Sequence, residues 1–304
     1  MLQTILSTIL FVGTGIVLLA PQVSLIRKVS EYSVHIMLGM LVFSILSMIF
    51  GKTKVMFSGL ACTAALCIFL KNASHDTLKF PEENARPKLN VAHINLGNIT
   101  YEFDAIKQML IEEDIDVVSF QELTPGWKFL GSELKERFPY SISEIRIDPY
   151  GLAVFSRMPL IESDTFLCNG IPSMNVVVEK AGMKFQVISS YLTPALDNKS
   201  LMVAAQQLEI IGKKVKSSNI PVIALGEYNM VYWTNEIRNF RAETKLQNSR
   251  RDLVVGNLRV PYDHIFFSNG LECTQFKEMK DLSQNYIGIL GTYQIKDVEK
   301  RAEL

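Results

Sequence analysis

The first 70 residues form three apolar segments that are separated by two short polar loops. The first segment, Leu2 to Ile26, contains no charged residue, and a helix of this length, rising about 1.5 Å per residue, crosses a hydrocarbon core of roughly 30 Å. Val34 to Phe50 and Val55 to Leu70 follow it. We therefore predict a three-helix transmembrane region over residues 1–70. The alternative for the second and third segments is an amphipathic hairpin inside a protein core.

The charges around these segments do not define a topology. The amino end lacks the basic residues that precede the apolar run of a cleaved signal peptide, so the first segment is expected to remain as a helix. Arg27 and Lys28 lie in the first loop, and Lys52 and Lys54 lie in the second. Because the two loops carry equal basic charge, the positive-inside rule leaves open which side of the membrane the following domain occupies.

The remainder of the chain has the pattern of a soluble α/β domain. Residues 71–88 are polar, contain Pro81 and Pro87, and are predicted to be a linker. Over residues 89–296, short apolar runs alternate with segments that carry apolar residues at helical spacing. Strands are predicted at 89–96, 115–122, 140–147, 151–156, 174–179, 184–191, 220–225, 262–268 and 286–295. Helices are predicted at 103–114, 127–138 and 201–216, and residues 297–304 form a charged tail.

Many short strands with few helices favour an α/β (α+β) fold. We expect a four-layer sandwich of two mostly antiparallel β-sheets flanked by helices, preceded by the transmembrane helical bundle. The 31 basic and 31 acidic side chains cancel, so the composition lacks the positive charge of a protein that binds nucleic acid. The four cysteines show no spacing typical of a zinc site.

Polar side chains follow several predicted strands at the point where each strand ends. The apolar run from Ile220 to Leu225 is followed by Gly-Glu-Tyr-Asn, which contains Glu227 and Asn229, and Asn95 and Glu122 follow two other strands. Carboxylates and carboxamides that converge from separate strands suit Mg²⁺, which prefers hard oxygen ligands. For each residue taken alone, a polar strand end or a cap is an equally good interpretation.

The order of these motifs resembles the endonuclease/exonuclease/phosphatase superfamily, which includes DNase-type nucleases and sphingomyelinases. The motifs are HINLGN with Asn95, DVVSFQE with Glu122, GLAVFSRMPL at 151–160, SSYLTP at 189–194, GEYN at 226–229 and YDHIFFSNGL at 262–271. The preceding apolar segments are similar to those of a membrane-anchored bacterial group within this superfamily. That likeness implies a multi-pass protein of the bacterial inner membrane.

The resemblance implies attack of water on a phosphate ester, with Mg²⁺ or Mn²⁺ holding the phosphate oxygens. It implies a metal-binding role for Glu122 and Asn95. Asn229 corresponds to an asparagine that contacts the phosphate, and Asp263 corresponds to the aspartate that orients the catalytic histidine.

The catalytic motifs depart from the family pattern at three places. A Thr-His pair is replaced by Ser190-Tyr191, the aspartate of Gly-Asp-Phe-Asn is replaced by Glu227, and a closing Ser-Asp-His is replaced by Ser283-Gln284-Asn285. The longer Glu227 side chain moves its carboxylate by about 1.5 Å, a shift that can reduce a rate about a hundredfold. We therefore treat the residues that correspond to catalytic ones as vestigial: Tyr191, Glu227, Asp263, Gln284 and Asn285.

No other histidine is expected to replace the missing base. Strand alternation places His264 on the opposite face from Asp263. His93 shares a face with Asn95 but lies one pleat repeat deeper, by roughly 6.6 Å. Gln284 and Asn285 do not titrate near neutral pH, as a general base must.

Two functions follow from these observations. The first is a membrane-anchored pseudoenzyme that binds a ligand or serves as a scaffold in a membrane assembly, with the bilayer and other membrane proteins as partners and no certain cofactor. The alternative is an active metal-dependent phosphodiesterase or phosphatase, which would use Mg²⁺ or Mn²⁺ on a phosphate ester at the membrane surface. A soluble nuclease is disfavoured by the apolar segments and the neutral charge, so nucleic acid is an unlikely partner.

Overall fold

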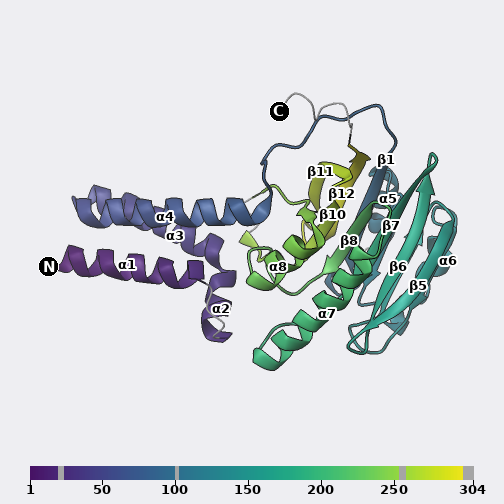
Figure 1. Cartoon of the computed structure of the whole chain (residues 1–304), viewed down its shortest axis with the longest axis horizontal. Coiled ribbons are helices and arrows are strands. Elements are labelled where there is room, and N and C mark those ends of the chain that lie inside the picture. The colour runs from purple at the N-terminus through teal and green to yellow at the C-terminus, as the bar shows by residue number, and fades with distance from the viewer. Residues whose placement is uncertain (20–23, 100–102, 253–257, 297–304) are drawn as a thin grey trace.

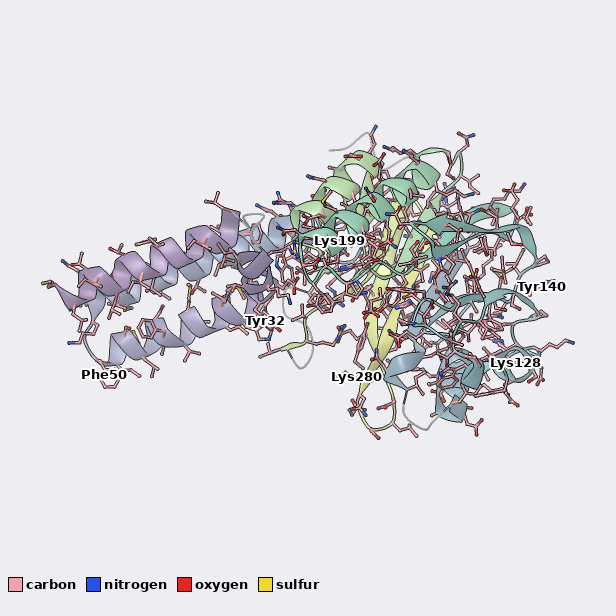
Figure 2. The ribbon with its side chains drawn as sticks, turned by 90° about the horizontal axis from the view of Figure 1, so that it is seen from below. Tyr32, Phe50, Lys128, Tyr140, Lys199 and Lys280 are labelled. Carbon is pink, nitrogen blue, oxygen red and sulfur yellow. The ribbon has the colours of Figure 1, made fainter. Side chains whose placement is uncertain are left out.

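The computed structural model describes residues 1–19, 24–99, 103–252 and 258–296, so the predicted tail at 297–304 lies outside the described residues. Three helices, α1 (Leu2–Leu19), α3 (Ser33–Ile49) and α4 (Thr53–Ser74), project together from one side of a β-rich domain (Figures 1 and 2). We call these three helices the helical stalk. The short helix α2 (Ser24–Glu31) lies at the base of the stalk (Figure 1).

Two stalk helices, α1 and α4, are long and apolar enough to cross a membrane, and α3 is a shorter apolar helix of 17 residues. Only 28% of the most apolar stretch of α4 is buried, and Phe43 on α3 is exposed, which argues against a core hairpin formed by these two helices. Of the segment predicted as one helix from Leu2 to Ile26, the structure describes α1 up to Leu19 and α2 from Ser24, and residues 20–23 lie outside the described residues. Arg27 in α2 donates a hydrogen bond of 2.8 Å to the Ala195 carbonyl, which holds this part of the chain against the domain.

Two six-stranded sheets form the centre of the domain, in the orders β11-β12-β1-β2-β4-β3 and β5-β6-β7-β8-β10-β9. The first contains β1 (Lys88–Asn95), β2 (Val117–Gln121), β3 (Tyr140–Glu144), β4 (Leu152–Ser156), β11 (Leu271–Lys280) and β12 (Tyr286–Ile295). The second contains β5 (Leu160–Cys168), β6 (Ile171–Lys180), β7 (Met183–Ser190), β8 (Val222–Glu227), β9 (Leu246–Asn248) and β10 (Asp263–Ser268). Among the strand pairs of the described residues, β1–β2 and β7–β8 are parallel and the others are antiparallel.

Apolar side chains fill the space between the sheets and beneath the helices. Val91, Val187 and Ile223 belong to the core between the two sheets. The helix α5 (Phe103–Glu112) shares a core with the outer face of the first sheet, and α7 (Asn198–Lys216) and α8 (Asn235–Thr244) do so with the second. These layers confirm the predicted sandwich of two mostly antiparallel sheets flanked by helices.

Some elements differ from the predicted ones. The strands β5, β9 and β11 and the helix α8 were not predicted. The three strands lie at sheet edges, and β5, for example, carries charged residues on its exposed side and lacks a continuous apolar run. The helix predicted at 127–138 was wrong in length, since the chain forms only a 3-10 turn, Pro125–Trp127, and the four-residue helix α6, Leu130–Glu133. Gly131 and Pro139 disfavour a longer helix there.

The strand register gathers the predicted site residues at one end of the sandwich. Asn95 pairs with Gln121 across β1 and β2, and Glu227 pairs with Asp263 across β8 and β10. The carboxyl ends of β1, β2, β7 and β8 therefore lie with the amino ends of β10 and β12, and we call this the site end. Gly226 permits the close approach of β8 and β7 there, because its φ is +139° and a Cβ atom would lie 2.0 Å from the Ser190 carbonyl oxygen.

The helical stalk docks on the site end. The indole nitrogen of Trp233, in the loop after β8, donates a hydrogen bond of 2.8 Å to the carbonyl of Ser30 at the base of the stalk. The hydroxyl of Ser74, where α4 ends, donates one of 2.8 Å to the carbonyl of Arg250. Leu70 of α4 belongs to the same apolar core as Trp233. Stalk and domain therefore share a hydrophobic core as well as hydrogen bonds.

We predict that Trp233→Phe lowers the free energy of unfolding of the full chain by about 1–3 kcal/mol, because it removes the hydrogen bond to Ser30 and part of a buried side chain. Denaturant unfolding in detergent micelles measures the change. Trp127→Phe is the matched control, since Trp127 is only partly buried, and it should cost less than about 1 kcal/mol. Equal losses in the two variants would contradict the proposed docking.

His264 faces away from Asp263, as strand alternation predicts. Its Nε2 lies 2.7 Å from the Met230 carbonyl oxygen, and its ring stacks on Phe266 at a centroid distance of 5.2 Å. Burial lowers the pKa of His264 from its ordinary value of 6.5 to about 3. The folded chain therefore holds this imidazole neutral at pH values where the unfolded chain protonates it.

This lowered pKa predicts an acid-sensitive fold. Below about pH 6.5 the unfolded state binds one more proton at this position than the folded state, so stability present above pH 6.5 is lost as the pH falls toward about 3. Wild type should lose up to about 1.4 kcal/mol more per pH unit than His264→Gln, whose amide still donates to Met230 but does not titrate. Urea unfolding at several pH values measures this difference. Parallel curves for the two proteins would show that His264 is not responsible.

Candidate functional site

A hollow of about 370 Å³ opens at the site end. Side chains from both sheets and from the loop before β10 line it: Asn95, Asn98, Glu122, Glu227, Arg259, Val260, Tyr262, Asp263 and Tyr286. We call this hollow the pocket. It brings together four of the residues that the sequence singled out, namely Asn95, Glu122, Glu227 and Asp263.

Asn95 is the last residue of β1, and its amide connects carboxylates from both sheets. The Nδ2 atom donates hydrogen bonds of 3.0 Å to Glu122 and of 2.6 Å to Glu227. The Oδ1 atom accepts a hydrogen bond of 2.8 Å from the backbone N–H of Gly97. Because the backbone fixes the amide, its nitrogen holds the two carboxylates in place.

The backbone around Glu122 is shaped to present its carboxylate. Glu122 has a φ of +59°. Residues other than glycine rarely adopt this backbone conformation, and those that do are often found at functional sites. A Cβ atom at Gly97 would lie 2.1 Å from the Glu122 Oε2 atom, so only glycine leaves room for the carboxylate there. The neighbouring Gln121 joins the sheets, since its Oε1 accepts from the Glu227 N–H at 2.9 Å and its Nε2 donates to the Ser190 carbonyl at 2.7 Å.

Glu227 lies in a strongly negative environment. Burial, followed by repulsion from Asp263, raises the pKa of Glu227 from 4.5 to about 7, and the negative charge of Glu122 acts in the same direction. The hydrogen bond from Asn95 offsets only part of this rise. A carboxylate that titrates near neutral pH at a strand end is typical of a functional site.

Asp263 is buried and is bound on both of its oxygens. The Nε2 atom of His93 lies 3.1 Å from Oδ1, and the hydroxyl of Tyr286 donates a hydrogen bond to Oδ2. Burial alone would raise the pKa of Asp263, but the hydrogen bond and charge of His93, together with Arg259, outweigh it and hold the pKa below its usual range. His93 thus lies deep, as expected, but it is a direct partner of Asp263.

Two further residues line the pocket: Tyr286, which the sequence did not reveal, and Arg259, a basic residue of the loop before Asp263. The Arg259 guanidinium lies 3.4 Å from the centroid of the Tyr286 ring, and its Nη2 lies 3.2 Å from Glu278. Burial, together with the charge of Asp263, raises the pKa of Tyr286 well above its ordinary value, so its hydroxyl stays protonated. The only signal for Tyr286 was its position directly after the triplet Ser283-Gln284-Asn285.

Gln284 and Asn285 are not brought into the pocket. Both are exposed in the turn between β11 and β12, where the Asn285 amide donates a hydrogen bond of 3.1 Å to Asp281. Tyr286, one residue further along, makes the contact with Asp263.

Tyr191 and Asn229 lie beside the pocket without lining it. The ring of Tyr191 is buried against Tyr150, at a centroid distance of 5.4 Å, and burial followed by the negative charge of Glu227 raises the pKa of its hydroxyl. Asn229 has a φ of +50°, and its amide donates a hydrogen bond of 2.9 Å to the Leu192 carbonyl. Both side chains therefore already have partners within the protein.

The donor atoms of the pocket suit Mg²⁺ or Mn²⁺ better than zinc. No group of three or more His, Cys, Asp or Glu at metal-binding spacing occurs among the described residues. Glu122 and Glu227, both held by Asn95, are hard oxygen donors, and Mg²⁺ commonly uses one or two carboxylates together with water and the phosphate of a ligand. Asp263 and Glu122 add to the effect of burial in raising the pKa of Glu227, and a divalent cation would neutralise part of their negative charge.

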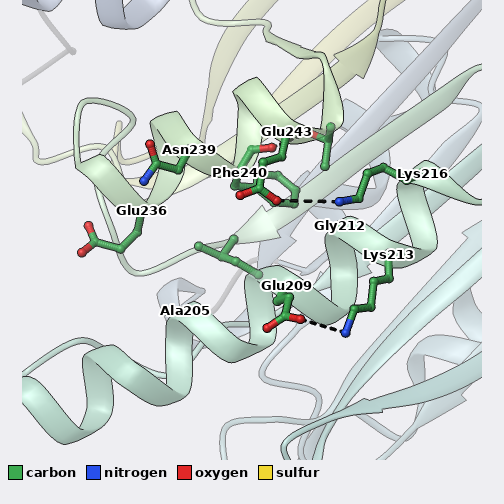
Figure 3. A pocket seen from close by; sticks show the side chains of 11 residues that line it. Ala205, Glu209, Gly212, Lys213, Lys216, Glu236, Asn239, Phe240 and Glu243 are labelled. Atoms are coloured by element: carbon green, nitrogen blue, oxygen red, sulfur yellow. Dashed lines mark hydrogen bonds and ion pairs between the residues drawn. The ribbon is translucent and has the colours of Figure 1, made fainter.

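A second hollow, of about 490 Å³, lies between α7 and α8 on the outside of the domain (Figure 3). Four of its charged side chains form two ion pairs, Lys213 with Glu209 at 2.8 Å and Lys216 with Glu243 at 3.7 Å. It contains none of the predicted site residues, and its paired charges indicate a solvated surface groove.

Comparison with solved structures shows the same fold in several proteins. The human Nocturnin catalytic domain with bound sulfate has a TM-score of 0.56 and 13% identity, and the match covers 70% of this chain and 97% of that chain. TDP2 from D. rerio, complexed with a single-strand DNA product, has a TM-score of 0.55 and 17% identity, with coverage of 68% and 99%. An endonuclease/exonuclease/phosphatase from Beutenbergia cavernae has a TM-score of 0.56 and 15% identity, with coverage of 69% and 72%.

Comparison with curated proteins found no match. The model of the Endonuclease/Exonuclease/phosphatase family matches residues 89–283, a range that includes both sheets up to the turn before β12. This range also contains every pocket residue except Tyr286. The chain therefore belongs to the Endonuclease/Exonuclease/phosphatase family.

Proposed function

We propose that this chain is a membrane-anchored pseudoenzyme of its family, whose pocket binds a phosphate group together with a divalent ion but does not hydrolyse it. In this role the domain serves as a binding component at the membrane. The contact between Tyr286 and Asp263 is the observation that supports the proposal most directly. Besides the buried His93, Asp263 binds a tyrosine that stays protonated, where the resemblance implies a catalytic histidine.

The other pocket groups do not replace that histidine. Arg259 is always charged, and the Asn95 amide does not titrate. His93 is fully buried beneath Asp263, and His264 is bound to Met230 on the opposite face. Abstraction of a proton from water needs a group whose pKa lies near the working pH, and neither Tyr191 nor Tyr286 meets this need.

The groups needed for binding remain. Glu122 and Glu227 would hold Mg²⁺ or Mn²⁺, which when bound supplies positive charge for phosphate oxygens. Arg259 contributes N–H donors at the pocket wall, and its side chain is 25% exposed to solvent. Asn95 keeps the two carboxylates from rotating away, so the pocket is already organised for an ion and its ligand.

The stalk supports placement at a membrane. Large apolar side chains are exposed on each of its helices, for example Phe11 on α1, Phe43 on α3 and Phe57 on α4. Such surfaces are costly in water and favourable against lipid. We expect the three helices to enter one bilayer as a multi-pass anchor, with the bilayer as the first partner of the protein.

A second function is an active phosphoesterase, and one observation favours it. The pKa of Glu227, raised to about 7 by burial and by Asp263, is the value that a general base requires. A bound divalent ion would lower this pKa again, because positive charge favours the carboxylate, and would leave the pocket without a base.

Hydrolysis of bis(4-nitrophenyl) phosphate by the full chain in detergent separates the two functions. With Mg²⁺ or Mn²⁺ present, we expect the wild-type rate to equal that of Glu122→Ala. Mg²⁺-dependent turnover that Glu122→Ala abolishes would contradict the pseudoenzyme. If Glu227→Gln abolished that turnover as well, the active phosphoesterase would be supported.

A further inference from the structure

We propose that the phosphate group taken by the pocket is the headgroup phosphate of a bilayer lipid, presented from the lipid layer at the base of the stalk. The inference rests on the proposed function, because it assumes that the pocket binds phosphate. It adds the source of that phosphate, which the pocket residues alone do not specify.

The pocket is connected directly to the base of the stalk. Tyr262 lines the pocket, and its hydroxyl donates a hydrogen bond of 2.8 Å to the carboxylate of Glu31. Glu31 is the last residue of α2 and lies two positions before Ser33, where α3 begins. One side chain therefore separates the pocket from the point at which the chain enters its apolar helices.

The base of the stalk has the features of a membrane interface. The exposed apolar surface continues along the helices as far as Leu19 at the end of α1 and Ile68 near the end of α4. At the base, Tyr32 is half exposed and Lys28 on α2 is exposed. Tyrosine and lysine side chains commonly lie at headgroup level, so α2 and Glu31 mark the headgroup layer on the side of the domain.

The site end also carries the most exposed apolar side chains of the domain. Among the described residues from 75 to 296, five large apolar side chains are 62% to 93% exposed: Ile147, Leu167, Leu196, Met202 and Leu282. All five lie toward the site end. Ile147 and Leu282 lie in the turns between β3 and β4 and between β11 and β12, Leu167 is the second-last residue of β5, Leu196 follows β7, and Met202 is near the start of α7. Apolar exposure gathered at the end that bears the stalk fits contact with lipid.

The charges of the pocket make this binding dependent on a divalent ion. Glu122, Glu227 and Asp263 contribute carboxylates, whereas Arg259 is the one basic residue among the lining residues that the structure describes. An anionic headgroup would be repelled by this excess of carboxylates until a divalent ion neutralised it. Lipid binding without Mg²⁺ or Mn²⁺ is therefore not expected.

The test uses the full chain in dodecyl maltoside micelles, which carry no phosphate. Phosphatidic acid is mixed into the micelles, or sn-glycerol 3-phosphate is added to the solution, each with Mg²⁺. Hydrogen exchange of the amides at 95–98 and 226–229 reports occupation of the pocket. We expect half-maximal protection at a phosphatidic acid concentration at least ten times lower than the glycerol phosphate concentration that gives the same effect.

Surface variants provide the control. Leu282→Glu and Met202→Glu alter exposed side chains at the site end and should weaken the effect of phosphatidic acid several-fold without changing that of glycerol phosphate. Ile161→Glu is the matched control, because this exposed side chain lies on β5 at the opposite end of the strands. It should change neither effect.

The outcomes distinguish this inference from the proposed function. Equal or better protection by glycerol phosphate would overturn the lipid source while leaving phosphate binding intact. Absence of protection by either compound with Mg²⁺ would overturn both.

Discussion

The site depends on one amide group. Asn95 ends a strand of the first sheet, and its nitrogen binds Glu122 from the same sheet and Glu227 from the other. Without this contact the two carboxylates would repel each other across the gap between the sheets. Because Gly97 fixes the amide oxygen and Gln121 ties β8 to β2, the backbone itself positions the acidic pair. The fold thus supplies an organised, negatively charged pocket before any ligand is present.

The same constraint fits the proposed function, in which the pocket binds a phosphate and a divalent ion but does not catalyse hydrolysis. Asp263 is next to this acidic pair, and its charge is stabilised by His93, Arg259 and Tyr286. These contacts keep His93 buried beside the pocket and place a protonated tyrosine at its wall. The pocket is lined by carboxylates, an amide and a guanidinium, which in the proposed function would bind an ion and a phosphate without activating water. The stalk, docked on the same end of the sheets, adds a reason for that ligand to come from the membrane.

Local patterns of apolar and polar residues were enough to predict most of the fold and part of the site. Apolar runs revealed the stalk helices, the central strands and the two-sheet fold, and motif order identified Asn95, Glu122, Glu227 and Asp263, which the structure gathers in one pocket. Edge strands such as β5 escaped prediction because the central residues of β5, Glu162 to Thr165, are all polar and interrupt its apolar pattern. Tyr286 escaped because its role comes from a tertiary contact, in which a single-residue offset from Asn285 decides which side chain meets Asp263. The link between Tyr262 and Glu31 joins residues far apart in the chain, so no local pattern could indicate it.

In the proposed function, the pocket holds a divalent ion while the Tyr286 hydroxyl remains hydrogen-bonded to Asp263. The most direct measurement is an experimental structure of the full chain with Mn²⁺, in which anomalous scattering locates the ion. The account predicts an anomalous peak between Glu122 and Glu227, with the Tyr286 hydroxyl remaining on Asp263. Absence of a peak at millimolar Mn²⁺, or a tyrosine displaced so that His93 reaches the ion or its water, would contradict it.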